Sequence, residues 1–107
     1  MIYKFKSKAG ADVIMLGPQG EQILRLFGRE PGSPGIIVQA DLSAAIFALE
    51  QAVAEDEAAF ARQQAEAQAA GEPVPRREGV SLRQRAWPLI ELMRHSLKAG
   101  VDLIWGA

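Results

Sequence analysis

The last third of the chain holds the pattern that most restricts how this sequence can fold. Ser81 and Gln84 have the spacing of a capping box, which starts a helix. Six apolar residues then recur on one helical face, as in a helix that packs on a core: Leu82, Ala86, Leu89, Ile90, Met93 and Leu97. Gly100 follows as a C-cap. Pro88 lies inside the pattern, so either the helix bends between Gln84 and Pro88 or a short turn precedes a helix that begins at Pro88.

The two ends of the chain predict short strands. Residues 2–6 alternate apolar and basic side chains, with Tyr3 and Phe5 on one face, which is the period of a half-buried strand. Residues 101–105 repeat this period, and Gly106 follows as a stop. Because two isolated strands are only marginally stable in water, we expect them to pair with each other, in a direction left open, and to pack on helices.

Residues 9–28 allow two interpretations. Five apolar residues fall in one helical stripe, which favours an amphipathic helix that kinks or breaks at Gly17 and Pro18: Val13, Leu16, Ile23, Leu24 and Phe27. The alternative is a hairpin, in which residues 12–16 form a second strand after a turn at residues 9–11. We prefer the helix because the stripe continues in phase across the break.

The middle of the chain predicts a loop followed by a long helix. Residues 28–35 contain three glycines and two prolines, and no Gly-Lys-Ser/Thr that would make them a phosphate loop. Residues 36–38 form a short buried strand in this interpretation. Asp41 is the expected N-cap of the helix. Its buried stripe is expected to comprise Leu42, Ile46, Leu49 and Val53.

The predicted helix changes character along its length. In residues 54–70 the only large apolar residue is Phe60, so helix propensity rather than burial favours a helix there. A helix over residues 41–70 is about 45 Å long, at 1.5 Å per residue. The second half is therefore a polar arm that protrudes, frays or lies on a partner. Residues 71–79 form a Pro/Gly linker.

These elements predict one α+β domain over residues 1–107. Three main helices pack on a small sheet formed by the N- and C-terminal strands. The length and the 49% hydrophobic content suit a single modest core. We expect twelve residues in that core: Tyr3, Phe5, Val13, Leu16, Ile23, Phe27, Ile46, Leu49, Leu89, Met93, Leu103 and Trp105.

Charge is distributed unevenly along the chain. Residues 1–40 carry five basic and three acidic side chains (+2), residues 41–72 one and seven (−6), and residues 73–107 six and three (+3), which sum to −1. This balance lacks the basic surface of a nucleic-acid-binding protein, and no apolar run reaches membrane-spanning length. We expect a cytoplasmic protein without membrane or nucleic-acid partners, whose opposed charges suit head-to-middle contact between copies.

The sequence offers few groups for catalysis. It has no Cys, Thr or Asn, and none of its five serines lies in a Gly-x-Ser-x-Gly motif. His95, the single histidine, lies opposite the core stripe within reach of Glu91. Residues 55–57 are acidic, but successive helical residues point in different directions. We therefore predict no catalytic residue, no metal and no cofactor, and an enzyme that uses carboxylates alone is disfavoured.

Arg83, Trp87, Arg94 and Lys98 gather on one flank of the last helix. They could form a binding surface for a small anionic ligand, with Trp87 stacking on a ring or an arginine. Alternatively, Trp87 finishes the edge of the core while the arginine stems pack around it, which is the interpretation we favour.

Several segments together resemble one family: residues 3–7, 12–15, 35–37 and 81–91, and the closing Trp105-Gly106. The chain is similar over nearly its whole length to a small family of uncharacterised proteobacterial proteins classed as a domain of unknown function. The resemblance implies a compact bacterial cytosolic protein and supplies no activity, cofactor or catalytic residue.

The sequence is compatible with three functions. We favour a non-enzymatic interaction or structural protein that self-associates, with a homodimer as the expected assembly. The alternative is a module that binds a small anionic ligand at Arg83, Trp87 and Arg94. A cleft enzyme is a third, and it requires at least two carboxylates converging in a pocket.

Overall fold

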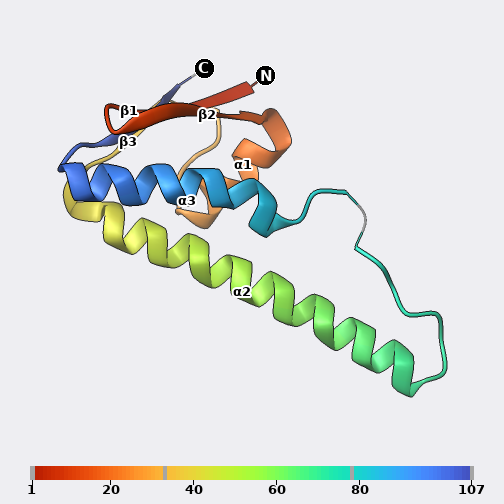
Figure 1. Cartoon of the computed structure of the whole chain (residues 1–107). Helices are drawn as coiled ribbons and strands as arrows, with labels where there is room; N and C mark the ends of the chain where they lie inside the picture. Colours follow the sequence, from red (N-terminus) through yellow and green to blue (C-terminus); the bar gives the residue numbers. More distant parts are fainter. Residues whose placement is uncertain (1, 33, 78, 107) are drawn as a thin grey trace.

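A computed structural model describes residues 2–32, 34–77 and 79–106. It shows a four-stranded antiparallel sheet with helices on one side, and one helix that extends far beyond the sheet (Figure 1). In chain order the elements are β1 (Ile2–Ser7), β2 (Gly10–Leu16), α1 (Gly17–Leu26), β3 (Gly35–Ile37), α2 (Gln39–Ala69), α3 (Leu82–Ala99) and β4 (Leu103–Gly106). The predicted α+β class, with three helices packed on a small sheet, is confirmed.

The terminal strands form the centre of the sheet, whose strand order is β2-β1-β4-β3. β1 and β4 pair with each other, as expected, and the direction that the sequence left open is antiparallel, with Phe5 opposite Trp105. On its other side β1 pairs with β2, which places Val13 opposite Phe5. β3 supplies the fourth strand, with Ile37 buried and Ile36 exposed. The sheet therefore contains two strands beyond the terminal pair.

Our preference for a helix over residues 9–28 is wrong, and the hairpin alternative is confirmed. β2 ends at Leu16 and α1 begins at Gly17. Pro18 lies in the first helical turn, where its missing N–H leaves no hydrogen bond unmade. The apolar residues are in phase on a helical wheel across the boundary between Leu16 and Gly17. The residues before this boundary nevertheless alternate with the two-residue period of a strand. For this reason Leu16, which we expected in the core, is 63% exposed.

The core lies between the sheet and the helices. Nine of the twelve predicted core residues are buried: Tyr3, Phe5, Ile23, Ile46, Leu49, Leu89, Met93, Leu103 and Trp105. Val13 and Phe27 are partly buried and pack against this cluster. Tyr3 shows how closely the sheet meets α1, because a Cβ atom on Gly20 would overlap its ring. The Tyr3 hydroxyl also accepts a hydrogen bond from the Gly32 N–H at 2.7 Å.

Helix α2 begins two residues earlier than predicted, so Asp41 is not its N-cap. Val38 holds the cap position without a side-chain hydrogen bond, and Asp41 lies in the first turn. The Gln39 N–H instead donates to Asp102 Oδ1, 2.9 Å away, from the segment before β4. A partner 63 residues distant thus satisfies a free helix donor. The predicted buried stripe of α2 is confirmed.

The second half of α2 extends away from the sheet, and the chain measures 51 × 28 × 22 Å along its principal axes (Figure 1). The returning linker contacts this half. The Arg77 guanidinium lies 4.4 Å from the Phe60 ring centroid and 3.1 Å from Asp56 Oδ2. The Gln64 side chain donates to the Pro75 carbonyl at 3.2 Å. The linker therefore covers one side of the protruding helix.

Helix α3 confirms the predicted caps. The Ser81 hydroxyl accepts from the Gln84 N–H, and the Gln84 side chain accepts from the Ser81 N–H. Gly100 ends the helix at φ 70°, a conformation that favours glycine. The helix is continuous through Pro88, so the alternative in which it begins at Pro88 is wrong. Proline has no N–H to donate to the carbonyl of Gln84, and that helical hydrogen bond is not made.

Candidate functional site

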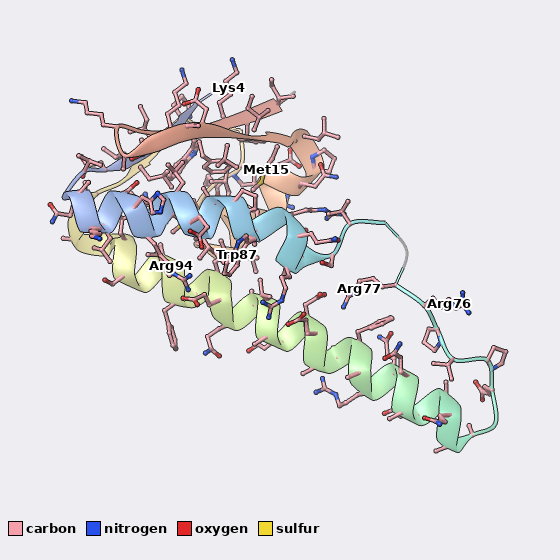
Figure 2. The ribbon with its side chains drawn as sticks, viewed as in Figure 1. Lys4, Met15, Arg76, Arg77, Trp87 and Arg94 are labelled. Carbon is pink, nitrogen blue, oxygen red and sulfur yellow. The ribbon has the colours of Figure 1, made fainter. Side chains whose placement is uncertain are left out.

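The three residues predicted for ligand binding come together where α3 faces α2. Trp87 and Arg94 project from α3 on the side that faces α2 (Figure 2), and Arg83 and Arg94 each donate to a carboxylate of α2. Spacings of four and seven residues, about one and two helical turns, place them on the same flank of α3, as the sequence indicates. The surface they form is therefore shared between two helices, and its charge depends on both.

Arg83 makes the stronger of two ion pairs across this interface. Its Nε and Nη2 atoms donate to the two carboxylate oxygens of Glu57, at 2.9 and 2.7 Å. The hydrogen bond from Arg83 lowers the pKa of Glu57 below its ordinary value, and the same bond raises the pKa of Arg83. Both groups are solvent-exposed, so water screens the attraction and the pair adds little stability.

Arg94 pairs with Glu50 and also contacts Trp87. Its Nη2 atom donates to Glu50 Oε2 at 2.7 Å, and its guanidinium carbon lies 5.7 Å from the Trp87 ring centroid. Trp87 is 47% exposed, so it lies at the margin of the core with one side in solvent. Arg94 lies within cation–π distance of the Trp87 ring, and carboxylates of α2 occupy both guanidiniums of the site.

Two hollows border Trp87. The larger, of about 440 Å³, is lined by Arg83, Gln84, Trp87 and Pro88. The smaller, of about 80 Å³, lies between α2 and α3 and contains one carboxylate, Glu50. A ligand in the larger hollow would meet the indole ring and an arginine that already has a carboxylate partner.

The remaining polar residues do not build a reaction centre within the part of the chain that the structure describes. His95 Nε2 lies 3.8 Å from Glu91 Oε2 at the helix surface, as the spacing indicates. The acidic residues 55–57 point in different directions, since Asp56 meets Arg77 while Glu57 meets Arg83. Across these same residues, no group of three or more His, Cys, Asp or Glu could hold a metal ion.

The sheet has a second, uncovered face that the sequence analysis did not single out. Because β-strand side chains alternate, residues next to the core residues point away from the helices. Five aliphatic side chains on this face are 43–63% exposed: Ile2, Ile14, Leu16, Ile36 and Ile104. Lys4 and Lys6 lie among them on β1, and Figure 2 shows Lys4 directed away from the helices while Met15 points toward them. We call this surface the open sheet face.

Helix α2 carries an exposed apolar stripe of its own. Its members recur at helical spacings and are all exposed: Phe47, Ala54, Ala58, Ala61 and Ala65. Phe47 alone is 64% exposed. Glu55 and Glu66 flank the stripe, and neither forms an ion pair with another described residue. We call this surface the α2 stripe.

A groove of about 500 Å³ runs between β2 and the first half of α3. Residues 12–16 form one wall, and Gln84, Arg85 and Pro88 form the other. The helix predicted for residues 12–16 would have no free strand edge, so the groove does not follow from that prediction. The hairpin alternative, with its alternation from Asp12 to Leu16, was the signal that could have located it.

The fold and these surfaces define a small α+β domain whose notable features are uncovered apolar surfaces. A family model described as "Domain of unknown function (DUF1840)" matches residues 1–105, and the chain belongs to that family. The predicted resemblance to a domain of unknown function is thus confirmed over nearly the whole chain. No curated protein and no solved structure matches it. Among the helices of the described residues, none has the length and apolar character needed to cross a membrane.

Proposed function

We propose that this protein is a non-enzymatic interaction protein that self-associates, with the open sheet face of one copy resting on the α2 stripe of another. The observation that carries the proposal is the open sheet face itself, where five large aliphatic side chains lie uncovered on one continuous sheet. Contiguous apolar surface of this kind marks interaction sites in soluble proteins.

Charge supports a second copy as the occupant. The open sheet face combines aliphatic residues with Lys4 and Lys6, and the α2 stripe is flanked by Glu55, Arg62 and Glu66, so its flank carries a net charge of −1. Apolar contact with opposite charges at the rim is the usual anatomy of a specific interface. Each copy offers both surfaces on opposite sides of the molecule (Figure 1), so the contact is heterologous: one copy presents its open sheet face and the other its α2 stripe. The length of α2 beyond the sheet gives the stripe the reach that such a contact needs (Figure 1).

Sedimentation velocity of the purified protein over a series of micromolar concentrations tests this proposal. We expect a concentration-dependent dimer, which Ile14→Glu abolishes by placing a carboxylate opposite the acidic flank of α2. The matched control is Val74→Glu, which makes the same change at an exposed apolar residue of the linker. A sample that stays monomeric throughout, or a dimer that both variants leave intact, would overturn the proposal.

Salt dependence gives an independent check on the charge argument. The Debye length falls from about 10 Å at 0.1 M salt to about 3 Å at 1 M, which weakens exposed lysine–glutamate attraction but leaves apolar contact. We therefore expect high salt to weaken the dimer without abolishing it. A dimer that tightens in high salt would show that the open sheet face meets another surface.

Binding of a small anion at Arg83, Trp87 and Arg94 is the second candidate, supported by the 440 Å³ hollow beside Trp87. It ranks lower because an anion must displace Glu57 or Glu50 from the arginines. Titration with inorganic phosphate, followed by Trp87 fluorescence, tests it with Trp105 removed as Trp105→Phe. A saturable change that Arg83→Gln weakens would support anion binding, and a flat titration would exclude phosphate.

We propose a non-enzymatic function because of the positions of the carboxylates. The groove beside β2 and the two hollows beside Trp87 each contain one carboxylate or none. Acid/base catalysis by carboxylates alone requires two groups converging on one substrate.

A further inference from the structure

The outer edge of β2 has no neighbouring strand among the described residues. β2 is an edge strand of the sheet and pairs only with β1. In an edge strand, alternate N–H and C=O groups point away from the sheet and can pair with another chain. Residues 10–16 contain no proline or lysine that would block such pairing, and their one register irregularity lies at the turn end. This edge can therefore accept a further strand.

The floor of this edge is a groove that suits apolar side chains. Val13 and Met15 line it from β2, and Pro88 lines it from α3, with Val80 at its margin. An added strand would place every second side chain toward α3 and into this space. The volume of about 500 Å³ holds a few aliphatic side chains.

Two charged side chains line the groove, Asp12 on β2 and Arg85 on α3, so a negatively charged group is favoured only on the α3 side. Arg85 lines it and forms no ion pair with any described residue. Helix α1 begins beside it without a side-chain cap and without an acidic residue in its first turn, so its N-terminal dipole is uncompensated. The guanidinium and this helix end both border the groove, and each favours an acidic side chain there.

The position of α3 selects a lone strand over a second copy at this edge. Helix α3 packs closely under β2, since a Cβ atom on Gly10 would lie 3.1 Å from Leu92 Cδ1. Paired strands lie about 4.8 Å apart, whereas packed helices need about 8 to 10 Å. Two copies that joined their β2 edges would therefore force their α3 helices together. A single extended segment has no such helix and can rest on α3.

We propose that the groove between β2 and α3 binds an extended segment of a partner protein as an added strand on β2, with an aliphatic side chain in the groove and an acidic side chain two residues away bound to Arg85. The two side chains are two residues apart because residues i and i+2 of a strand share a face. The groove borders the open sheet face and shares Ile14 and Leu16 with it, but the free edge of β2 and the α3 wall lie outside that face. The inference therefore does not rest on the dimer proposed above.

The probes are fluorescein-labelled, end-blocked octapeptides centred on Glu-Thr-Val or on Val-Thr-Glu, which cover antiparallel and parallel addition. Fluorescence anisotropy with the full chain should give saturable binding for one of them. Removing a charge-assisted hydrogen bond costs about tenfold in affinity, so Arg85→Gln should weaken binding by about that factor. Arg76→Gln is the matched control, because Arg76 is exposed on the linker and forms no ion pair with a described residue.

Two further measurements make the test independent of any folding defect in the variants. Methylation of alternate peptide nitrogens removes the hydrogen bonds that an added strand needs and should abolish binding to the unmodified protein. Amide chemical-shift changes should be confined to β2 and the first half of α3. Failure of both peptides to saturate, unchanged affinity of Arg85→Gln or of the methylated peptide, or shifts confined to the open sheet face would each overturn the inference.

Discussion

The two faces of the sheet are built from similar residues, but helices cover only one of them. One face buries Phe5, Leu103 and Trp105 under the helices, while the other leaves Ile14, Ile104 and their neighbours in solvent. Strand alternation sends adjacent aliphatic residues in opposite directions, so their hydrophobicity alone does not distinguish the faces. Only the helices distinguish the two faces, because they cover one of them. The covered face stabilises the domain, and we assign the uncovered one to interaction.

Adjacent residues of β4 provide the most direct way to break this comparison. Leu103 is fully buried and Ile104 is 46% exposed on the opposite face. Leu103→Ala should lower the free energy of unfolding by about 2 to 5 kcal/mol, because it removes apolar contact and leaves a cavity. Ile104→Ala should cost well under about 1 kcal/mol in dilute, monomeric protein. Urea denaturation measures both, and equal losses would show that the two faces are equally covered.

A second change tests how closely the sheet meets its cover. Gly20→Ala would place a methyl group against the Tyr3 ring, which should cost about 1 to 3 kcal/mol through overpacking. Without that clash, alanine in a helix would stabilise by about 0.5 to 1 kcal/mol. The sign of the change in the free energy of unfolding therefore shows whether the added methyl group clashes with the Tyr3 ring. Tyr3→Leu combined with Gly20→Ala should recover part of the loss, and stabilisation by Gly20→Ala alone would contradict the close contact.

The hydrogen bond that anchors α2 over the covered face should have a smaller effect. Asp102→Ala removes the side chain that accepts from the Gln39 N–H, and loss of such a helix cap costs about 1 kcal/mol. Asp12→Ala is the control, because the Asp12 side chain forms no hydrogen bond or ion pair with a described residue. Thermal unfolding of the two variants measures the difference, which should vanish if the contact does not cap α2 in solution.

The smallest expected effect concerns the ion pair between the two covering helices. Arg83 lowers the pKa of Glu57, so the pair contributes its stability above the ordinary pKa of 4.5 and loses it as the pH falls through the lowered value. The difference in melting temperature between the unmodified protein and Glu57→Gln should be small near neutral pH and disappear in acid. Glu72→Gln, at an exposed linker carboxylate that forms no ion pair with a described residue, is the control and should show no such trend. A difference that grows in acid would contradict the sign.

Prediction from sequence succeeded where one local pattern had one structural solution. The capping box at Ser81, the C-cap at Gly100 and the buried stripe of α2 all depend on residues within one helix. The prediction for residues 9–28 failed because the apolar residues are in phase both on one continuous helix and on a strand followed by a helix. The pairing of β2 with β1 decided between them, and pairing is a contact between segments. Because the predicted sheet lacked β2, neither the open sheet face nor the groove beside β2 could be identified from the sequence.

The sequence by itself determined the α+β class, the pairing of the chain ends, the long helix with its polar second half and the caps of α3. Each follows from periodicity, propensity or capping, which act over a few neighbouring residues. Only the tertiary structure decided that Leu16 faces solvent, that Asp102 caps α2, and that Glu50 and Glu57 occupy the arginines beside Trp87. These depend on residues far apart in the chain. No local pattern encodes them, because burial and charge pairing are properties of the packed molecule.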